Sequence, residues 1–467
     1  MVAAGLDSCL ARMRGAGTAP HAVAQFVRAY ERLVAGERGW LPESELEPVE
    51  HVAGGDGLGR ADAGASDGLH GVAIVRLNGG LGTTMATDAG KGGLEVKPGL
   101  SFVELAIGRA EALRRDSGQA LPLLFMNGTA TGPAAAPDGA VGRPGPEPGA
   151  FVQSWLPRVG ADDLAPVEWP RDPSLEWAPA GHGDVFPALA RSGWLGALRE
   201  AGFEYACISS VDNVAAVVDG RIATAMRLES IPFVMEVADR TDVDRKGGHL
   251  ACRRGGGFVL RDRAQVPPDE QDAFQDIARH RFFNTNTIWV ELRALAELLA
   301  RRDLLLDLPL IANHKVLDPY DETSPEVIQV ESAMGSGISV FAGAEVRRVE
   351  RDGFNPVKTT AELLAVRSDA YVLTPEHRIE LAPERAGRAP TIELDPVHFA
   401  RQRDFDERFA AGPLSLIGCD SLVVRGDVSF GAGVVVRGSV CIDHPGPGRR
   451  HVPSGSVLDG GQTAAHA

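Results

Sequence analysis

Short apolar runs bounded by glycine and polar residues recur along the chain. Four of them have the length and composition of buried strands, at 72–75, 121–126, 205–210 and 233–237. A helical stretch at 102–115 separates the first two runs. Because strands that alternate with helices favour a parallel sheet, this pattern predicts an α/β fold with a mixed, mostly parallel central sheet.

The N-terminal part of the chain has a helical pattern. Apolar side chains recur there at the spacing of one helix face, at Val23, Phe26, Val27, Tyr30 and Val34. Such a stripe is typical of an element that packs on the rest of the protein. Residues 51–70 are rich in glycine, alanine and aspartate and are interpreted as a flexible connector. We therefore expect residues 1–65 to form a helical segment with its connector.

The C-terminal residues repeat with a period of six. Two rows of apolar residues interleave there, with glycines at the turns between them. The rows consist of Leu422, Val428, Val434 and Val440, and of Val424, Phe430, Val436 and Ile442. This pattern is typical of a short parallel β-helix. We expect that module and the tail to occupy residues 401–467, and a large α/β domain to occupy residues 66–400.

Composition and charge exclude several classes of function. The 467 residues carry a net charge of −16, which argues against binding to nucleic acid or to an anionic membrane. No apolar run reaches the length of about 18 residues that a membrane-spanning helix needs, and the first residues lack the pattern of a signal peptide. The five cysteines are widely spaced, which argues against a disulfide framework or a metal cluster. We therefore expect a cytoplasmic protein.

The first apolar run leads into a glycine cluster. Residues 78–84 are Asn-Gly-Gly-Leu-Gly-Thr-Thr, and Lys91 follows. Glycines at the carboxyl end of a strand allow backbone N–H groups to approach a polyphosphate, at the edge where open α/β sheets bind ligands. The stretch matches neither the P-loop nor the dinucleotide fingerprint, and a plain glycine-rich turn is the alternative. We interpret it as a nucleotide-phosphate loop.

Lysine is scarce in this chain. Of 47 lysines and arginines only five are lysine, so arginine supplies the other 42. A lysine that persists in such a composition indicates a position where a compact point charge is needed. Lys91 and Lys358 are the two that stand in distinctive sequence motifs.

Several motifs together resemble one family. Residues 77–83, with Met85 and Lys91, are similar to the signature of the eukaryotic-type UTP–glucose-1-phosphate uridylyltransferases, also called UDP-glucose pyrophosphorylases. Further stretches resemble motifs of that family in the same order, at 153–158, 177–184, 209–213, 282–289, 327–335 and 354–360. The resemblance implies a Rossmann-like, GT-A-like sheet of the nucleotide-diphospho-sugar transferase type, followed by a left-handed parallel β-helix.

The resemblance also implies roles for individual residues. The nucleotide-binding set would be Leu77, Asn78, Gly79, Gly80, Gln153, Gly181 and Asp212. The sugar-phosphate set would be His182, Asn284 and Asn286, and the catalytic cations would be Lys91 and Lys358. Asp212 would hold Mg²⁺, which takes oxygen ligands and substrate phosphates. The amide of Gln153 would read the uracil edge, because it offers a donor and an acceptor together.

The implied reaction joins UTP and glucose 1-phosphate to give UDP-glucose and pyrophosphate, with no covalent intermediate. Three residues depart from the family pattern: Leu156, Ser210, where the local hydrogen bonding would differ from the family's, and Thr287, which leaves the choice of sugar open. A broad-specificity UDP-sugar pyrophosphorylase or a UDP-N-acetylglucosamine pyrophosphorylase is one alternative, and a nucleotide-sugar binder without turnover is another. We expect self-association, if any, through the C-terminal module.

Overall fold

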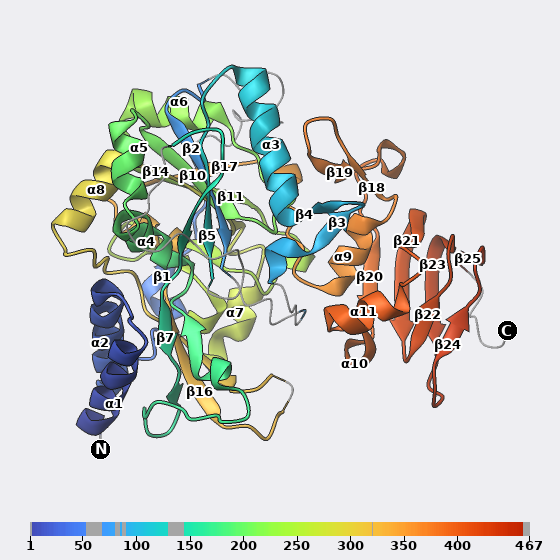
Figure 1. The fold of residues 1–467 in the computed structure, drawn as a ribbon, viewed down its shortest axis with the longest axis horizontal. Helices are drawn as coiled ribbons and strands as arrows, with labels where there is room; N and C mark the ends of the chain where they lie inside the picture. Colours follow the sequence, from blue (N-terminus) through green and yellow to red (C-terminus); the bar gives the residue numbers. More distant parts are fainter. Residues whose placement is uncertain are drawn as a thin grey trace.

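The computed structural model describes residues 2–52, 68–79, 85, 90–128, 144–319 and 321–460. A central α/β body carries the helices α1 and α2 (Val2–Gly15 and Pro20–Val34) on one side and a C-terminal module at its far end (Figure 1). Gly80, most of the predicted nucleotide loop and most of the predicted connector lie outside the described residues. The predicted domain boundaries stay a prediction.

Ten strands form the central sheet. They are β1 (Leu46–Glu47), β2 (Val72–Asn78), β5 (Leu123–Asn127), β6 (Gly149–Val152), β10 (Tyr205–Ser210), β11 (Phe233–Asp239), β12 (His249–Arg253), β13 (Phe258–Arg261), β14 (Phe282–Glu291) and β17 (Glu345–Arg348). The main order is β1-β12-β14-β10-β2-β5-β6, with β13 beside β12 and β11 between β14 and β17. The four predicted buried strands are confirmed as β2, β5, β10 and β11.

The sheet is mixed, as the sequence predicts, but it is less parallel than expected. Strands β10, β2, β5 and β6 run parallel, as does the pair β11 and β17. Strand β14 runs antiparallel to β10, β11 and β12. The prediction of a mostly parallel sheet is therefore wrong for the half built around β14. An apolar run buried on both faces gives no sign of strand direction, which is why the pattern did not reveal this.

Helices cover both faces of the sheet. Apolar side chains of α4 (Val185–Arg191), α5 (Trp194–Glu200) and α8 (Leu292–Ala300) pack on one face. Those of α3 (Phe102–Ser117) and α6 (Gly220–Glu229) pack on the other. The predicted helix at 102–115 is thus confirmed, and the sequence explains its ends. Ser101 and Glu104 form a capping box at its start, and Gly118 ends it in the left-handed conformation.

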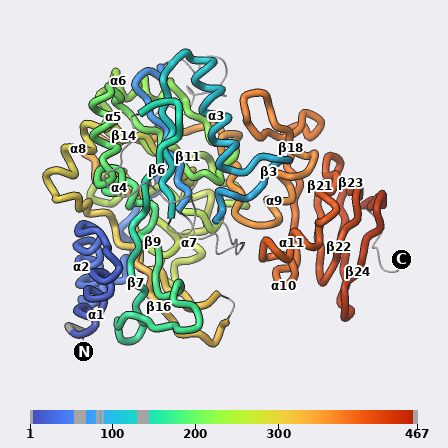
Figure 2. Tube along the Cα trace, viewed as in Figure 1, coloured from blue at the N-terminus to red at the C-terminus, as the bar shows by residue number. Residues whose placement is uncertain are grey.

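The helices α1 and α2 pack on a strand-rich extension of the body (Figure 2). The extension consists of β7 (Trp155–Pro157), β8 (Val159–Gly160), β9 (Trp177–Pro179), β15 (Ile311–Val316) and β16 (Glu326–Glu331). Phe26 and Tyr30 of the predicted stripe are buried against it, which confirms α2 as a packing helix. Val34 is 44% exposed, because the helix ends there and leaves the contact.

The C-terminal module begins with α9 (Thr360–Arg367) and a hairpin of β18 and β19 (Tyr371–Leu373 and Ile379–Leu381). Two helices, α10 (Pro396–Phe399) and α11 (Gln402–Arg408), precede its longer strands. β20 (Thr391–Leu394), β21 (Ser415–Arg425), β23 (Val435–Asp443) and β25 (Val457–Asp459) form one parallel sheet, and β22 (Val428–Phe430) pairs in parallel with β24 (Arg450–Val452).

All eight residues of the two period-six rows are buried in this module. They belong to the same apolar cluster as α3 and the inner strands of the central sheet, so one continuous core joins the module to the body. Among the described helices, none has the length and apolar character needed to cross a membrane. The five cysteines are free thiols.

Candidate active site

Polar side chains meet where the parallel strands β2 and β5 end. Nδ2 of Asn78 donates to Oδ1 of Asn127 over 2.8 Å, and the backbone N–H of Gln153 donates to the carbonyl oxygen of Asn127 over 2.8 Å. A Cβ on Gly79 would collide with Oε1 of Gln153, so a larger residue there would displace the amide of Gln153. Leu77 lies directly before this group and is buried. These contacts form the side of the candidate site where the sequence predicts nucleotide binding, called the nucleotide side below.

Gln153 is tied to a second tight turn. Its Nε2 donates to the carbonyl oxygen of Gly181 over 2.6 Å, which leaves Oε1 as an acceptor. Gly181 has a φ of +83°, and a Cβ on it would overlap the backbone of Ser332. Both facts require glycine at this position. The turn therefore packs its bare backbone against the backbone of Ser332.

His182 follows in the same turn, and its tautomer is set by a neighbour. The backbone N–H of Met334 donates to Nδ1 of His182 over 3.1 Å, so the hydrogen of the neutral ring lies on Nε2. Burial lowers the pKa of His182, and Lys358 lowers it further while Asp262 opposes the shift. The ring is therefore neutral at physiological pH and presents an Nε2–H donor.

Two opposite charges pair at the carboxyl end of β2 and β10. Lys91 begins the single turn η3 (Lys91–Gly93), and Nζ donates to Oδ2 of Asp212. Asp212 follows β10, and its carbonyl oxygen accepts from the N–H of Val357 over 3.0 Å. This last contact joins the Asp212 segment to the segment that carries Lys358. Within the described residues no cluster of three or more metal-ligating side chains exists.

Lys358 lies at the entry to helix α9. Its backbone N–H donates to Oε2 of Glu362 over 2.6 Å, and Thr359 forms a capping box with the same glutamate. The backbone is thus fixed by the helix cap while the ammonium group is exposed to solvent. The chain therefore presents an exposed point charge from a backbone that the helix cap fixes.

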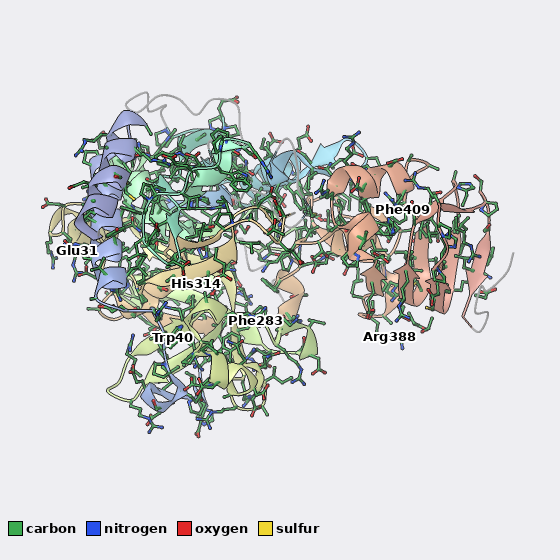
Figure 3. The ribbon with its side chains drawn as sticks, turned by 90° about the horizontal axis from the view of Figure 1, so that it is seen from below. Glu31, Trp40, Phe283, His314, Arg388 and Phe409 are labelled. Carbon is green, nitrogen blue, oxygen red and sulfur yellow. The ribbon has the colours of Figure 1, made fainter. Side chains whose placement is uncertain are left out.

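A cleft of about 1020 Å³ adjoins Lys358. Asn284 and Asn286 line it, and the two amides bond each other, because Nδ2 of Asn284 donates to Oδ1 of Asn286 over 2.8 Å. Asn286 has a φ of +54°, which asparagine tolerates better than most residues. Phe283, on β14 of the central sheet, also lines the cleft and is labelled in Figure 3. Paired amides facing a cleft suit a ligand with several hydroxyl groups.

The structure brings the predicted residues into three neighbouring groups. Leu77, Asn78, Gly79, Gln153 and Gly181 form the first, and Lys91 and Asp212 the second. The third consists of Lys358, Asn284 and Asn286 at the cleft, with His182 close enough to Lys358 to feel its charge.

Two residues of the site were missed. Asn127 bonds Asn78, and its place directly at the end of a buried strand was the available signal. Lys246 lines the cleft, and its position beside two glycines was the available signal. Thr287, one of the departures, is buried and does not line the cleft.

Comparison with known proteins gives one consistent result. A family profile described as UTP–glucose-1-phosphate uridylyltransferase matches residues 23–437. The chain is 37% identical to the UTP–glucose-1-phosphate uridylyltransferase of Solanum tuberosum, with 82% of this chain and 79% of the relative covered. It is 35% identical to a probable enzyme of the same description from Schizosaccharomyces pombe, with 89% and 81% covered.

Two solved structures are similar over almost the whole chain. A UDP-glucose phosphorylase from Trypanosoma brucei superposes with a TM-score of 0.87, at 36% identity and 98% coverage of both chains. A mutant UDP-glucose pyrophosphorylase from Leishmania major in complex with UDP-glucose superposes with a TM-score of 0.85, at 35% identity and 99% coverage of both chains.

Proposed function

The chain belongs to the UTP–glucose-1-phosphate uridylyltransferase family, and on this premise we propose that it is the enzyme that makes UDP-glucose and pyrophosphate from UTP and glucose 1-phosphate. The observation that carries the proposal is the grouping of the site. One set of strand ends brings together a nucleotide side, a lysine–aspartate pair and a cleft lined by amides.

The nucleotide side suits uridine. Because Nε2 of Gln153 is engaged by Gly181, its Oε1 is the atom left to accept the N3–H of uracil. The adjacent Gly79 has no side chain to cover that oxygen. Base recognition through one amide and bare backbone then places the phosphates toward Lys91.

The reaction needs charge stabilisation more than acid–base chemistry. An oxygen of the sugar phosphate attacks the α-phosphorus of UTP in line, the bond to the β-phosphate oxygen breaks, and pyrophosphate leaves. The attacking phosphate is already ionised, so no general base is required. Lys91 and Lys358 offset the negative charge that builds on the α-phosphate and on the leaving group, and Nε2–H of neutral His182 donates to the sugar phosphate.

Asp212 is the residue that would hold Mg²⁺. A single carboxylate at a strand end fits this ion, which commonly takes one or two protein carboxylates and completes its shell with substrate phosphates and water. The ion would supply further positive charge beside the phosphates. Lys91 contacts the same carboxylate, so Mg²⁺ would compete with the lysine for it and release the lysine for phosphate.

Asn284 and Asn286 select the sugar in this proposal. Their amides present donors and acceptors to the hydroxyls of the hexose, and a sugar that leaves one of them unpaired binds less well. A broad-specificity enzyme differs from this one only in that selection, so the sugar test below separates the two.

The deciding experiment measures pyrophosphate release from UTP and Mg²⁺ with glucose, galactose and N-acetylglucosamine 1-phosphates. Release with glucose 1-phosphate well ahead of the others supports the proposal. Comparable release with several sugars assigns a broad UDP-sugar pyrophosphorylase. No release with any sugar, together with measurable UDP-glucose binding, leaves the non-catalytic binder.

We also propose that the C-terminal parallel sheets complete a left-handed β-helix and provide a surface for self-association. The inward rows of period six support the first point. Strand β25 supports the second, because it ends its sheet and carries Val457, which is 49% exposed. Light scattering across a concentration series tests association, and Val457→Lys should lower the apparent mass if this edge mediates it.

A further inference from the structure

Helix α2 reaches the back of the turn that carries Gly181 and His182. Nε2 of Gln25 donates to Oγ of Ser332 over 3.3 Å, and this hydroxyl donates to the carbonyl oxygen of Ala180 over 3.3 Å. The N–H of Ser332 donates to the same carbonyl oxygen over 3.0 Å. Helix α2 is therefore hydrogen-bonded to Ser332, which holds the turn with Gly181 and His182, and it also packs on the body.

Asp184 closes the same turn and is completely buried. Its Oδ2 accepts from the backbone N–H of Ser154 over 2.6 Å. Its Oδ1 has no hydrogen-bond partner within the described part of the chain. A buried carboxylate with an unpartnered oxygen is costly unless a positive or donating group compensates it.

His21 of α2 stands against that oxygen. Its Nε2 lies 3.7 Å from Oδ1 of Asp184 and 3.4 Å from Oγ of Ser154. The residue is only 6% exposed, so water does not reach the group freely. Any form of His21 that carries hydrogen on Nε2 directs a donor at the carboxylate. Across the residues that the structure describes, His21 is the basic side chain that pairs with Asp184.

Ser154 links Asp184 to the residues of the nucleotide side. It directly follows Gln153, and its carbonyl oxygen accepts from the N–H of Ala180 over 3.0 Å. Gln153 in turn donates to Gly181 over 2.6 Å. A shift of Asp184 therefore moves Gln153 and Gly181 together.

We propose that His21 and Asp184 are positioning residues for the uridine nucleotide, with His21 compensating the buried carboxylate that holds Ser154 and Gln153 in register with Gly181. The inference rests on the proposed function, because it takes Gln153 and Gly181 as nucleotide contacts. It assigns to helix α2 a part in substrate binding that its amphipathic pattern does not reveal.

The test compares His21→Leu with His21→Gln. Leucine removes the donor and leaves Asp184 uncompensated, and we expect KM for UTP to rise about tenfold while kcat changes less. Glutamine places an amide nitrogen near the position of Nε2 and should restore KM. Glu31→Ala, on the exposed face of the same helix (Figure 3), is the matched control and should leave KM unchanged.

A double variant keeps the test decisive if His21→Leu unfolds. In the D184N background the buried charge is gone, so His21→Leu should add little to KM. An equal effect of His21→Leu in both backgrounds would overturn the proposal, as would a loss of kcat or of folded protein with KM for UTP unchanged.

Failure of the proposed function is distinguishable from failure of this inference. If the wild-type protein releases no pyrophosphate, the proposed function fails. Calorimetric titration with UTP then still compares the variants. A weaker Kd for His21→Leu, restored in His21→Gln, supports the positioning role, and equal Kd values overturn it.

Discussion

Lys91 and Asp212 form an ion pair although 121 residues separate them in the chain. Their side chains are only 16% and 11% exposed, so solvent screens the pair weakly. The proposed reaction uses both groups for other partners, the lysine for phosphate and the carboxylate for Mg²⁺. The ion pair neutralises the two charges until the substrate binds. Binding must then replace this contact with a lysine–phosphate contact and a carboxylate–Mg²⁺ contact.

Asp212→Asn is predicted to disable the reaction without unfolding the protein. The amide still fits the site, and the backbone contact of residue 212 with Val357 is unaffected. We expect kcat/KM to fall about 100-fold, because charge stabilisation at the phosphates is lost, and half-maximal activity to need more Mg²⁺. A Mg²⁺ titration of pyrophosphate release measures both. Asp420→Asn, at an exposed position of the C-terminal module, is the control. An unchanged Mg²⁺ titration curve would contradict the assignment.

Lys358→Ala is predicted to act on the transition state alone. The helix cap is made by the backbone of residue 358, Thr359 and Glu362, so the substitution leaves it in place. We expect kcat/KM to fall by about 100-fold to 1,000-fold, as when one preorganised donor is removed, with the thermal unfolding temperature unchanged. Lys358→Arg should restore activity only in part, because a planar guanidinium does not replace a point charge.

The matched control for that experiment is Lys315→Ala, which removes a half-exposed lysine on β15. It should leave kcat/KM near the wild-type value. If Lys358→Ala also leaves kcat/KM near that value, then Lys358 is a surface lysine and the proposed charge stabilisation is wrong.

The sequence predicted much of the fold because its strands and helices have clear local patterns. The run at 205–210 and the helical stretch at 102–115 are visible without any coordinates. The antiparallel direction of β14 was not predictable from the sequence, because it depends on which strands pair over long distances.

The candidate site likewise has features that the sequence shows and features that only the fold shows. Gly79 and Gly181 could be singled out from the sequence, and the structure shows each in close contact with a neighbouring segment. The ion pair of Lys91 with Asp212, the tautomer of His182 and the contact of His21 with Asp184 could not. Each of these joins segments that are distant in the chain, so only the folded geometry reveals it.

Thr287→Asn is predicted to leave the sugar preference unchanged. Thr287 is 2% exposed, pairs in register with Ser209 of β10, and does not line the cleft. By contrast, Asn286→Ala removes an amide that faces the cleft, and KM for glucose 1-phosphate should rise about tenfold. Competition between glucose and galactose 1-phosphates measures both variants. A change of preference in Thr287→Asn would mean that the buried side of β14 shapes the sugar site.

Acid is predicted to destabilise the fold through two stacked histidines. The ring centroids of His249 and His280 lie 3.9 Å apart, and both side chains are fully buried. Burial lowers the pKa of each below 6.5, most strongly for His249. Glu43 accepts from His280 and opposes its shift, while Arg261 lowers the pKa of both rings, Arg240 that of His249 and Arg279 that of His280.

The direction of this pH effect on stability follows from proton binding. Both rings take up protons less readily in the folded protein than in the unfolded chain, whose histidines are protonated as the pH falls through about 6.5. Their contribution to stability is therefore complete above that pH and is lost below it, by up to roughly 1.4 kcal/mol per pH unit for each ring. Urea denaturation at pH 7.5 and pH 5.5 should show a lower midpoint at the acid pH. His249→Phe keeps a stacking ring without a titrating nitrogen and should reduce that difference, whereas replacement of the exposed His451 by phenylalanine should not. A difference in midpoint that is unaffected by His249→Phe would assign the acid sensitivity to other groups.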